Sequence, residues 1–145
     1  MRRILVFLLA VLLAASAGSM IQSLVNLQAI AALTGPIATA EQLSTLWFDL
    51  RHFMPVLAAI FLPIMLLSLV LSRIVLKRAT LGKVPAVFVI TALSTWAALL
   101  IINQLAPMPT LIALNRTLAG TLLLLSCSSL GAVFYHYFSR SRSVA

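Results

Sequence analysis

The side chains suited to acid–base chemistry are few and lie in one short segment. The chain has only two acidic residues, Glu41 and Asp49, and His52 follows Asp49 by three positions. Residues three apart share a helix face, so Asp49 and His52 could act as a general acid–base pair. No nucleophile motif surrounds them, and a solvated polar helix face explains the same pattern. The sequence therefore favours a protein that is not an enzyme, and we assign no catalytic residue.

Metal and haem sites are also disfavoured. Cys127 is the single cysteine, so neither an intrachain disulfide nor a multi-cysteine metal motif can form. His52 and His136 are the two histidines, and together they could ligate one haem iron. They fall, however, at opposite ends of predicted membrane helices, separated by about 30 Å of hydrocarbon. We therefore expect no metal and no cofactor.

Other polar side chains gather where the apolar stretches end. Polar groups at the ends of membrane helices face inward only where something polar satisfies them. They could satisfy one another, or they could form a pocket for a polar headgroup, within which we expect Asp49 and Arg116 to form an ion pair. This set, which we call the polar end cluster, comprises Gln22, Asn26, Asp49, His52, Asn103, Gln104, Asn115 and Arg116.

The elements that must position these residues are long and apolar. Hydrophobic residues make up 63% of the 145-residue chain and charged residues 8%, whereas a soluble domain carries about 25% charged residues. Apolar stretches at about residues 4–27, 54–71, 84–102 and 118–138 are near the roughly 20 residues that cross a bilayer. The sequence predicts an all-α integral membrane protein, a single four-helix bundle over residues 1–145 with the lipid bilayer as its solvent.

The segment between the first two stretches predicts an additional amphipathic helix. Thr34-Gly35-Pro36 should end the first helix, and Thr39-Ala40-Glu41-Gln42 has the form of a capping box. Apolar residues then recur at helical spacing, and Trp47 suits the headgroup boundary. We expect this helix to lie at the outer membrane surface. The second span should follow it, with Pro55 in its first turn and a kink at Pro63.

Small residues form stripes on two of the predicted spans. Ala10, Ala14 and Gly18 are spaced by four on the first span, and Cys127 and Gly131 are spaced by four on the last. Such stripes let two helices approach closely in lipid. We expect these five residues to carry helix packing.

Basic residues mark one side of the membrane. Cationic loops resist translocation, so the side that holds most of them stays in the cytoplasm. The sequence therefore predicts an inner (plasma) membrane protein with both termini cytoplasmic. The same placement accounts for the net charge of +8 without a nucleic-acid partner. The eight residues on this side are Arg2, Arg3, Arg73, Lys77, Arg78, Lys83, Arg140 and Arg142.

The N-terminus admits two interpretations. Two arginines, an apolar run and Ala15-Ser16-Ala17 resemble a cleavable signal peptide. The same residues could begin a first span that reaches about Leu27. We favour the span, because residues 18–25 remain mostly apolar. Cleavage of residues 1–17 would leave three spans and an external N-terminus.

Three functional hypotheses follow. The central turns of the spans hold no Asp, Glu, Lys or Arg, which argues against a proton-coupled exporter, because such a protein needs a titratable group in the membrane. The first hypothesis is a non-enzymatic accessory or structural subunit of a larger membrane complex, bound to other subunits or to itself. The second is binding or transport of a hydrophobic small molecule, a lipid or a quinone, at the polar end cluster, which we expect on the outer face of the membrane. The third is a membrane enzyme that uses Asp49 and His52.

Overall fold

The computed structural model describes residues 1–77, 82–105 and 112–140. These residues form four α-helices and one short 3₁₀ helix, and no strand: α1 (Arg2–Thr34), α2 (Thr39–Leu76), α3 (Lys83–Leu105), η1 (Ala113–Arg116) and α4 (Leu118–Arg140). Each α-helix is long and apolar enough to cross a membrane. The prediction of an all-α protein with four such helices is confirmed. Arg78 and Arg142, two of the eight basic residues assigned to the cytoplasmic side, lie outside the described residues.

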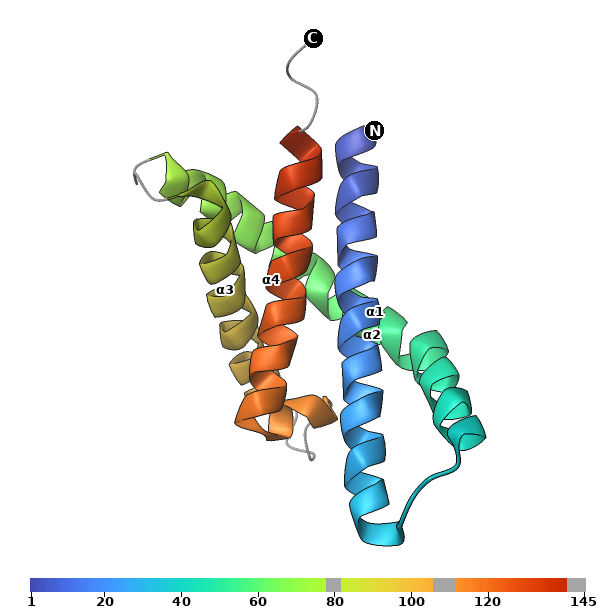
Figure 1. The fold of residues 1–145 in the computed structure, drawn as a ribbon. Coiled ribbons are helices and arrows are strands. Elements are labelled where there is room, and N and C mark those ends of the chain that lie inside the picture. Colours follow the sequence, from blue (N-terminus) through green and yellow to red (C-terminus); the bar gives the residue numbers. More distant parts are fainter. Residues whose placement is uncertain (78–81, 106–111, 141–145) are drawn as a thin grey trace.

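The helices pack in a ring. α1 packs against α2 and α4, and α3 packs against the same two helices. α1 and α4 run antiparallel, while α2 crosses behind them at a steep angle (Figure 1). The N-terminus, the end of α4, the end of α2 and the start of α3 therefore lie at one end of the bundle (Figure 1). We call this the basic end, because Arg2, Arg3, Arg73, Lys77 and Lys83 belong to it.

The ends of α1 follow from local chemistry. The predicted break at Thr34-Gly35-Pro36 is confirmed, since α1 ends at Thr34. Gly35 adopts a φ of 94° and donates its N–H to the Ala31 carbonyl at 2.9 Å. Only glycine takes this left-handed conformation without a steric cost. No helix breaker lies between Leu27 and Thr34, so the helix continues well past the predicted end of the span.

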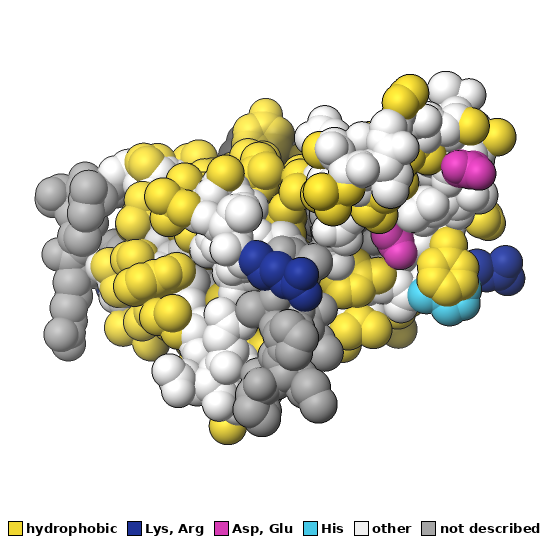
Figure 2. All heavy atoms as spheres, turned by 90° about the horizontal axis from the view of Figure 1, so that it is seen from below, with side chains coloured by type: hydrophobic (Ala, Val, Ile, Leu, Met, Phe, Trp, Pro, Cys, Tyr) yellow, Lys and Arg dark blue, Asp and Glu magenta, His cyan; other side chains and the backbone are white. Residues whose placement is uncertain are grey.

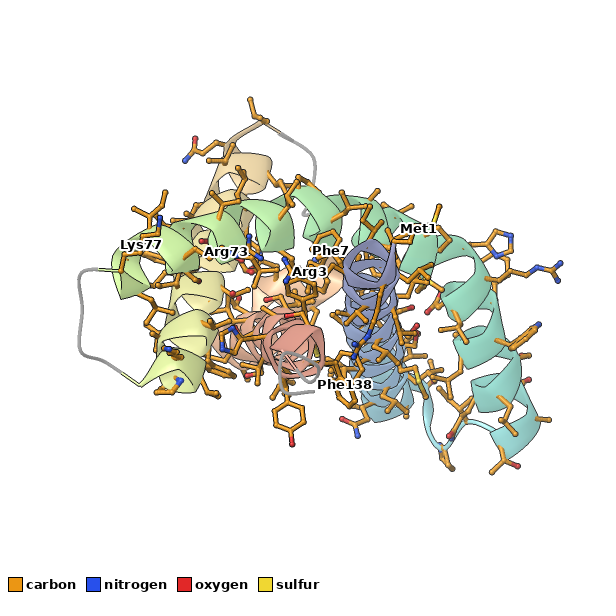
Figure 3. All side chains as sticks on the ribbon, turned by 90° about the horizontal axis from the view of Figure 1, so that it is seen from above. Met1, Arg3, Phe7, Arg73, Lys77 and Phe138 are labelled. Atoms are coloured by element: carbon orange, nitrogen blue, oxygen red, sulfur yellow. The ribbon has the colours of Figure 1, made fainter. Side chains whose placement is uncertain are left out.

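The prediction of a separate amphipathic helix before the second span is wrong. The amphipathic segment is not a separate helix, because one continuous helix runs from Thr39 to Leu76 with both Pro55 and Pro63 inside it. This helix bends, so that its first part turns away from the direction of the rest (Figures 1 and 3). A proline removes one backbone hydrogen bond and bends a helix, but neighbouring helices can hold the helix together. The capping box is also absent, and Gln42 Nε2 instead donates to the Ile37 carbonyl at 2.9 Å.

Small residues let α1 and α4 approach closely. Ala10 and Ala14 are at most 3% exposed. A Cβ atom added to Gly131 would lie 2.9 Å from Ala14 Cβ and 3.0 Å from the Ala10 carbonyl oxygen. Gly18, one turn beyond Ala14, faces Leu57 of α2 instead. The small-residue stripes of the two helices therefore contact each other inside this chain, and the first 17 residues contribute to its core.

Hydroxyl groups connect the other helices. Thr91 of α3 donates to Ser68 Oγ of α2 at 3.1 Å, and Thr95 of α3 lies 2.8 Å from Ser128 Oγ of α4. All four side chains are fully buried. In a bilayer such interhelical hydrogen bonds hold helices together where hydrophobic burial alone gives no preference. The surface at the same levels is apolar, with Leu67, Leu93 and Leu130 each more than half exposed, which is compatible with a multi-pass membrane protein.

Candidate binding groove at the basic end

A cavity of about 610 Å³ opens at the basic end. All four α-helices contribute to it. In Figure 3, which looks onto this end, the side chains of Arg3 on α1 and Arg73 on α2 both point into the space between α1, α2 and α4. We call this cavity the basic groove. It is lined by Arg3, Leu69, Ser72, Arg73, Leu76, Lys77, Lys83, Val87, Tyr135, His136 and Ser139.

The α2 wall of the groove follows from helical periodicity. Leu69, Ser72, Arg73 and Leu76 have the spacing i, i+3, i+4, i+7, which places them on one face of a helix. That face carries a leucine at each end, with a serine and an arginine between them. Ser72 is buried and donates to the Ser68 carbonyl at 2.6 Å. The wall is thus apolar in part and ends in a cation.

The remaining walls come from the ends of the other helices. Arg3 lies in the first turn of α1, Lys83 is the first residue of α3, and Tyr135 lies near the end of α4. Tyr135 packs edge-on against Phe7 of α1, with ring centroids 5.7 Å apart. Val87, one turn into α3, is 1% exposed and supplies apolar lining. The helix ends supply charge, and the first turns below them supply apolar surface.

No side-chain carboxylate of this chain balances the charge of the groove. The only acidic residues are Glu41 and Asp49, and both belong to the first part of α2, far along the chain from Arg73. Figure 2, which looks onto the end opposite the basic end, shows acidic side chains there. The groove therefore combines four cations, Arg3, Arg73, Lys77 and Lys83, with no Asp or Glu among its lining residues.

The residues of the polar end cluster belong to α1, α2, the end of α3 and η1. Gln22 is buried on α1, and its Oε1 atom has no hydrogen-bond partner. Asn26 is partly buried one turn later. Asn103 and Gln104 are exposed at the end of α3. On the other side of the α3–α4 connection, Asn115 Oδ1 accepts a hydrogen bond from Thr121 at 2.8 Å.

Asp49 of α2 forms a hydrogen bond with α1. Its carboxylate accepts a hydrogen bond from Ser23 Oγ at 2.6 Å, whereas the sequence predicted Arg116 as its partner. The reason is the crossing of α1 and α2, which brings Asp49 to the buried Ser23. Sequence reasoning did not select Ser23, since a serine one residue from Gln22 carries no distinguishing signal.

Asp49 and His52 also make separate contacts. The His52 ring is exposed and stacks on Phe48 with centroids 4.2 Å apart, and its Nδ1 lies 3.0 Å from the Phe48 carbonyl oxygen. The contact of Asp49 is with Ser23. Each group therefore has a partner on its own element or on α1. Within the described residues, no group of three or more His, Cys, Asp or Glu side chains is placed to hold a metal ion.

Comparison with known proteins gives no match: no protein family, no curated protein and no solved structure resembles this chain closely enough to be reported.

Proposed function

We propose that this protein is a non-enzymatic membrane protein that binds one amphiphilic, lipid-like molecule in the basic groove. The observation that carries this proposal is the combination of a cationic rim with apolar walls in one cavity. An amphiphile needs both kinds of surface, because its headgroup is charged and its tail is apolar. Leu69, Leu76 and Val87 would contact the first part of a hydrocarbon chain, and the charged rim would contact its headgroup.

The size of the groove supports this proposal. Its volume of about 610 Å³ lies within the roughly 300–1,000 Å³ of small-molecule sites. That volume exceeds what a single ion needs. If the basic end is cytoplasmic, as cationic residues favour, the ligand would come from the inner leaflet of the membrane.

The proposed ligand is a lipid-like molecule, as in the second hypothesis from the sequence. The proposed site, however, is the basic groove and not the polar end cluster. The competing hypothesis of an accessory subunit drew on the small-residue stripes. Because Ala10 and Ala14 contact Gly131 within the chain, these stripes give no independent argument for a protein partner. We therefore place lipid binding first and the subunit hypothesis second.

The test is native mass spectrometry of the protein purified in mild detergent. We expect one lipid-sized adduct per chain. Leu76→Trp would fill the groove and should reduce the adduct, whereas Leu66→Trp, on an exposed face of the same helix, should retain it. Copurification of a stoichiometric membrane protein with no bound lipid would favour the subunit hypothesis instead. Equal adducts in both variants would contradict the proposed site.

A further inference from the structure

We propose that the molecule bound in the basic groove carries two phosphate groups on a lipid tail. This inference rests on the proposed function and adds the chemistry of the headgroup. Two kinds of membrane molecule share this chemistry. One is a phospholipid dimer in which a glycerol links two phosphate groups, and the other is an isoprenoid diphosphate. The argument starts from the four cations that line the groove, Arg3, Arg73, Lys77 and Lys83.

The first step concerns charge. Four like charges around one cavity repel one another, and repulsion is stronger beside a low-dielectric interior than in water. Both acidic residues of the chain belong to the first part of α2, and neither lines the groove. We therefore infer that a bound anion neutralises the four cations. A zwitterionic headgroup brings no net charge. A single phosphodiester brings one negative charge, while two phosphates bring two or more.

The second step concerns the donors. Arg3 and Arg73 reach into the same space from different helices (Figure 3), and a guanidinium fork matches two phosphate oxygens. Lys77 directly follows the last residue of α2 and Lys83 is the first residue of α3, so these two charges lie at neighbouring helix ends. The two arginines would hold one phosphate and the two lysines the other. The Tyr135 and Ser139 hydroxyls also line the groove and can donate to phosphate oxygens.

The third step separates binding from orientation. Basic residues at this end would also be expected if they served only to orient the helices. Arg2 and Arg3 contribute equally to orientation, because they are adjacent and carry the same charge. In the structure they differ: Arg3 lines the groove, whereas Arg2 donates to the Phe138 carbonyl at 3.3 Å and does not line it. This pair therefore provides a matched control within the chain.

The experiment measures the binding of defined lipids to the delipidated protein in detergent by native mass spectrometry. The probes are tetraoleoyl cardiolipin, geranylgeranyl diphosphate, dioleoyl phosphatidylglycerol and dioleoyl phosphatidylcholine. We expect one of the two-phosphate probes to bind at least tenfold more tightly than phosphatidylglycerol, and phosphatidylcholine to bind most weakly. Which of the two binds tighter identifies the source. Arg3→Gln and Arg73→Gln should each weaken that binding about fivefold or more, as expected for a cation near an anionic surface, while Arg2→Gln should leave it unchanged.

Several results would overturn the inference. If phosphatidylcholine binds the groove as tightly as the two-phosphate lipids, the headgroup assignment is wrong and the proposed function survives. If no probe binds, the headgroup assignment and the proposed function are both wrong. Equal weakening by Arg2→Gln and Arg3→Gln would show unspecific attraction to the basic end. Should Arg3→Gln or Arg73→Gln not fold, Lys83→Gln, at an exposed groove position, gives the same comparison.

Discussion

Glycine-to-alanine substitutions at three positions test the packing of the bundle. Alanine is favoured over glycine within a helix by about 1 kcal/mol, so the balance depends on what the new methyl group meets. At Gly131 it would lie 2.9 Å from Ala14 Cβ and 3.0 Å from the Ala10 carbonyl oxygen. Neither atom can rotate away, so α1 and α4 must separate. Overpacking of this kind costs about 1–3 kcal/mol, and we expect Gly131→Ala to destabilise the protein by about 1 kcal/mol net.

Gly18→Ala is the matched control. Gly18 is also buried within a helix, but its added methyl group would meet Leu57 Cδ2 at 2.8 Å and then Leu124 Cδ2 at 3.6 Å. The end of a leucine side chain can move, so the gain in helix preference should remain. We expect this variant to be as stable as the parent or slightly more stable. Gly120→Ala should be the most damaging, because the methyl group would overlap the backbone carbonyl of Leu114.

The assay for all three variants is thermal unfolding in one detergent, followed by tryptophan fluorescence. For a chain of this length, 1 kcal/mol corresponds to roughly 3 °C in Tm. We therefore expect Tm to decrease in the order Gly18→Ala, Gly131→Ala, Gly120→Ala. The Tm of the parent should be close to that of Gly18→Ala. The reasoning is refuted if Gly131→Ala is as stable as the parent while Gly18→Ala is the less stable of the two.

Three further predictions concern hydrogen bonds and the N-terminus. Ser23→Ala removes the donor to Asp49 and should cost about 1–2 kcal/mol in detergent unfolding; an unchanged Tm would contradict that contact. A double-mutant cycle on Thr95→Val and Ser128→Ala should give a coupling energy of about 0.6 kcal/mol and no more than about 1.7, and a value of zero would show that the pair does not interact. Because Ala10, Val11, Ala14 and Ala15 are buried in the core, the intact mass of the purified protein should include residues 1–17, and loss of that segment would favour the signal-peptide interpretation.

The four apolar helices could be predicted, because the hydropathy of a segment depends only on its own residues. Gly35 marked the end of α1, since a glycine next to a proline stops a helix whatever surrounds it. The continuity of α2 could not be predicted in the same way. Whether Pro55 ends a helix or bends it depends on packing with neighbouring helices, and the local sequence carries no record of that packing.

The basic groove was not predicted, although its cations were identified. The sequence showed that Arg2 and Arg3 lie at the end of a span, and orientation explained both. Adjacent helical residues differ by about 100° around the axis, so only one of them could face the groove, and the choice depends on where α2 crosses. The available signal was the mixture of apolar and polar residues on one helix face, Leu69, Ser72, Arg73 and Leu76. It became informative once α3 and α4 were placed opposite it.

The central claim is that the four apolar helices cross a bilayer with the basic end in the cytoplasm. Single cysteines can test it in a Cys127→Ala background, with Lys77→Cys at the basic end and Thr39→Cys at the start of α2. Intact cells are treated with a membrane-impermeant maleimide before and after permeabilisation. We expect Thr39→Cys to react in intact cells and Lys77→Cys to react only after permeabilisation. Labelling of Lys77→Cys in intact cells, or of both variants equally, would contradict the account.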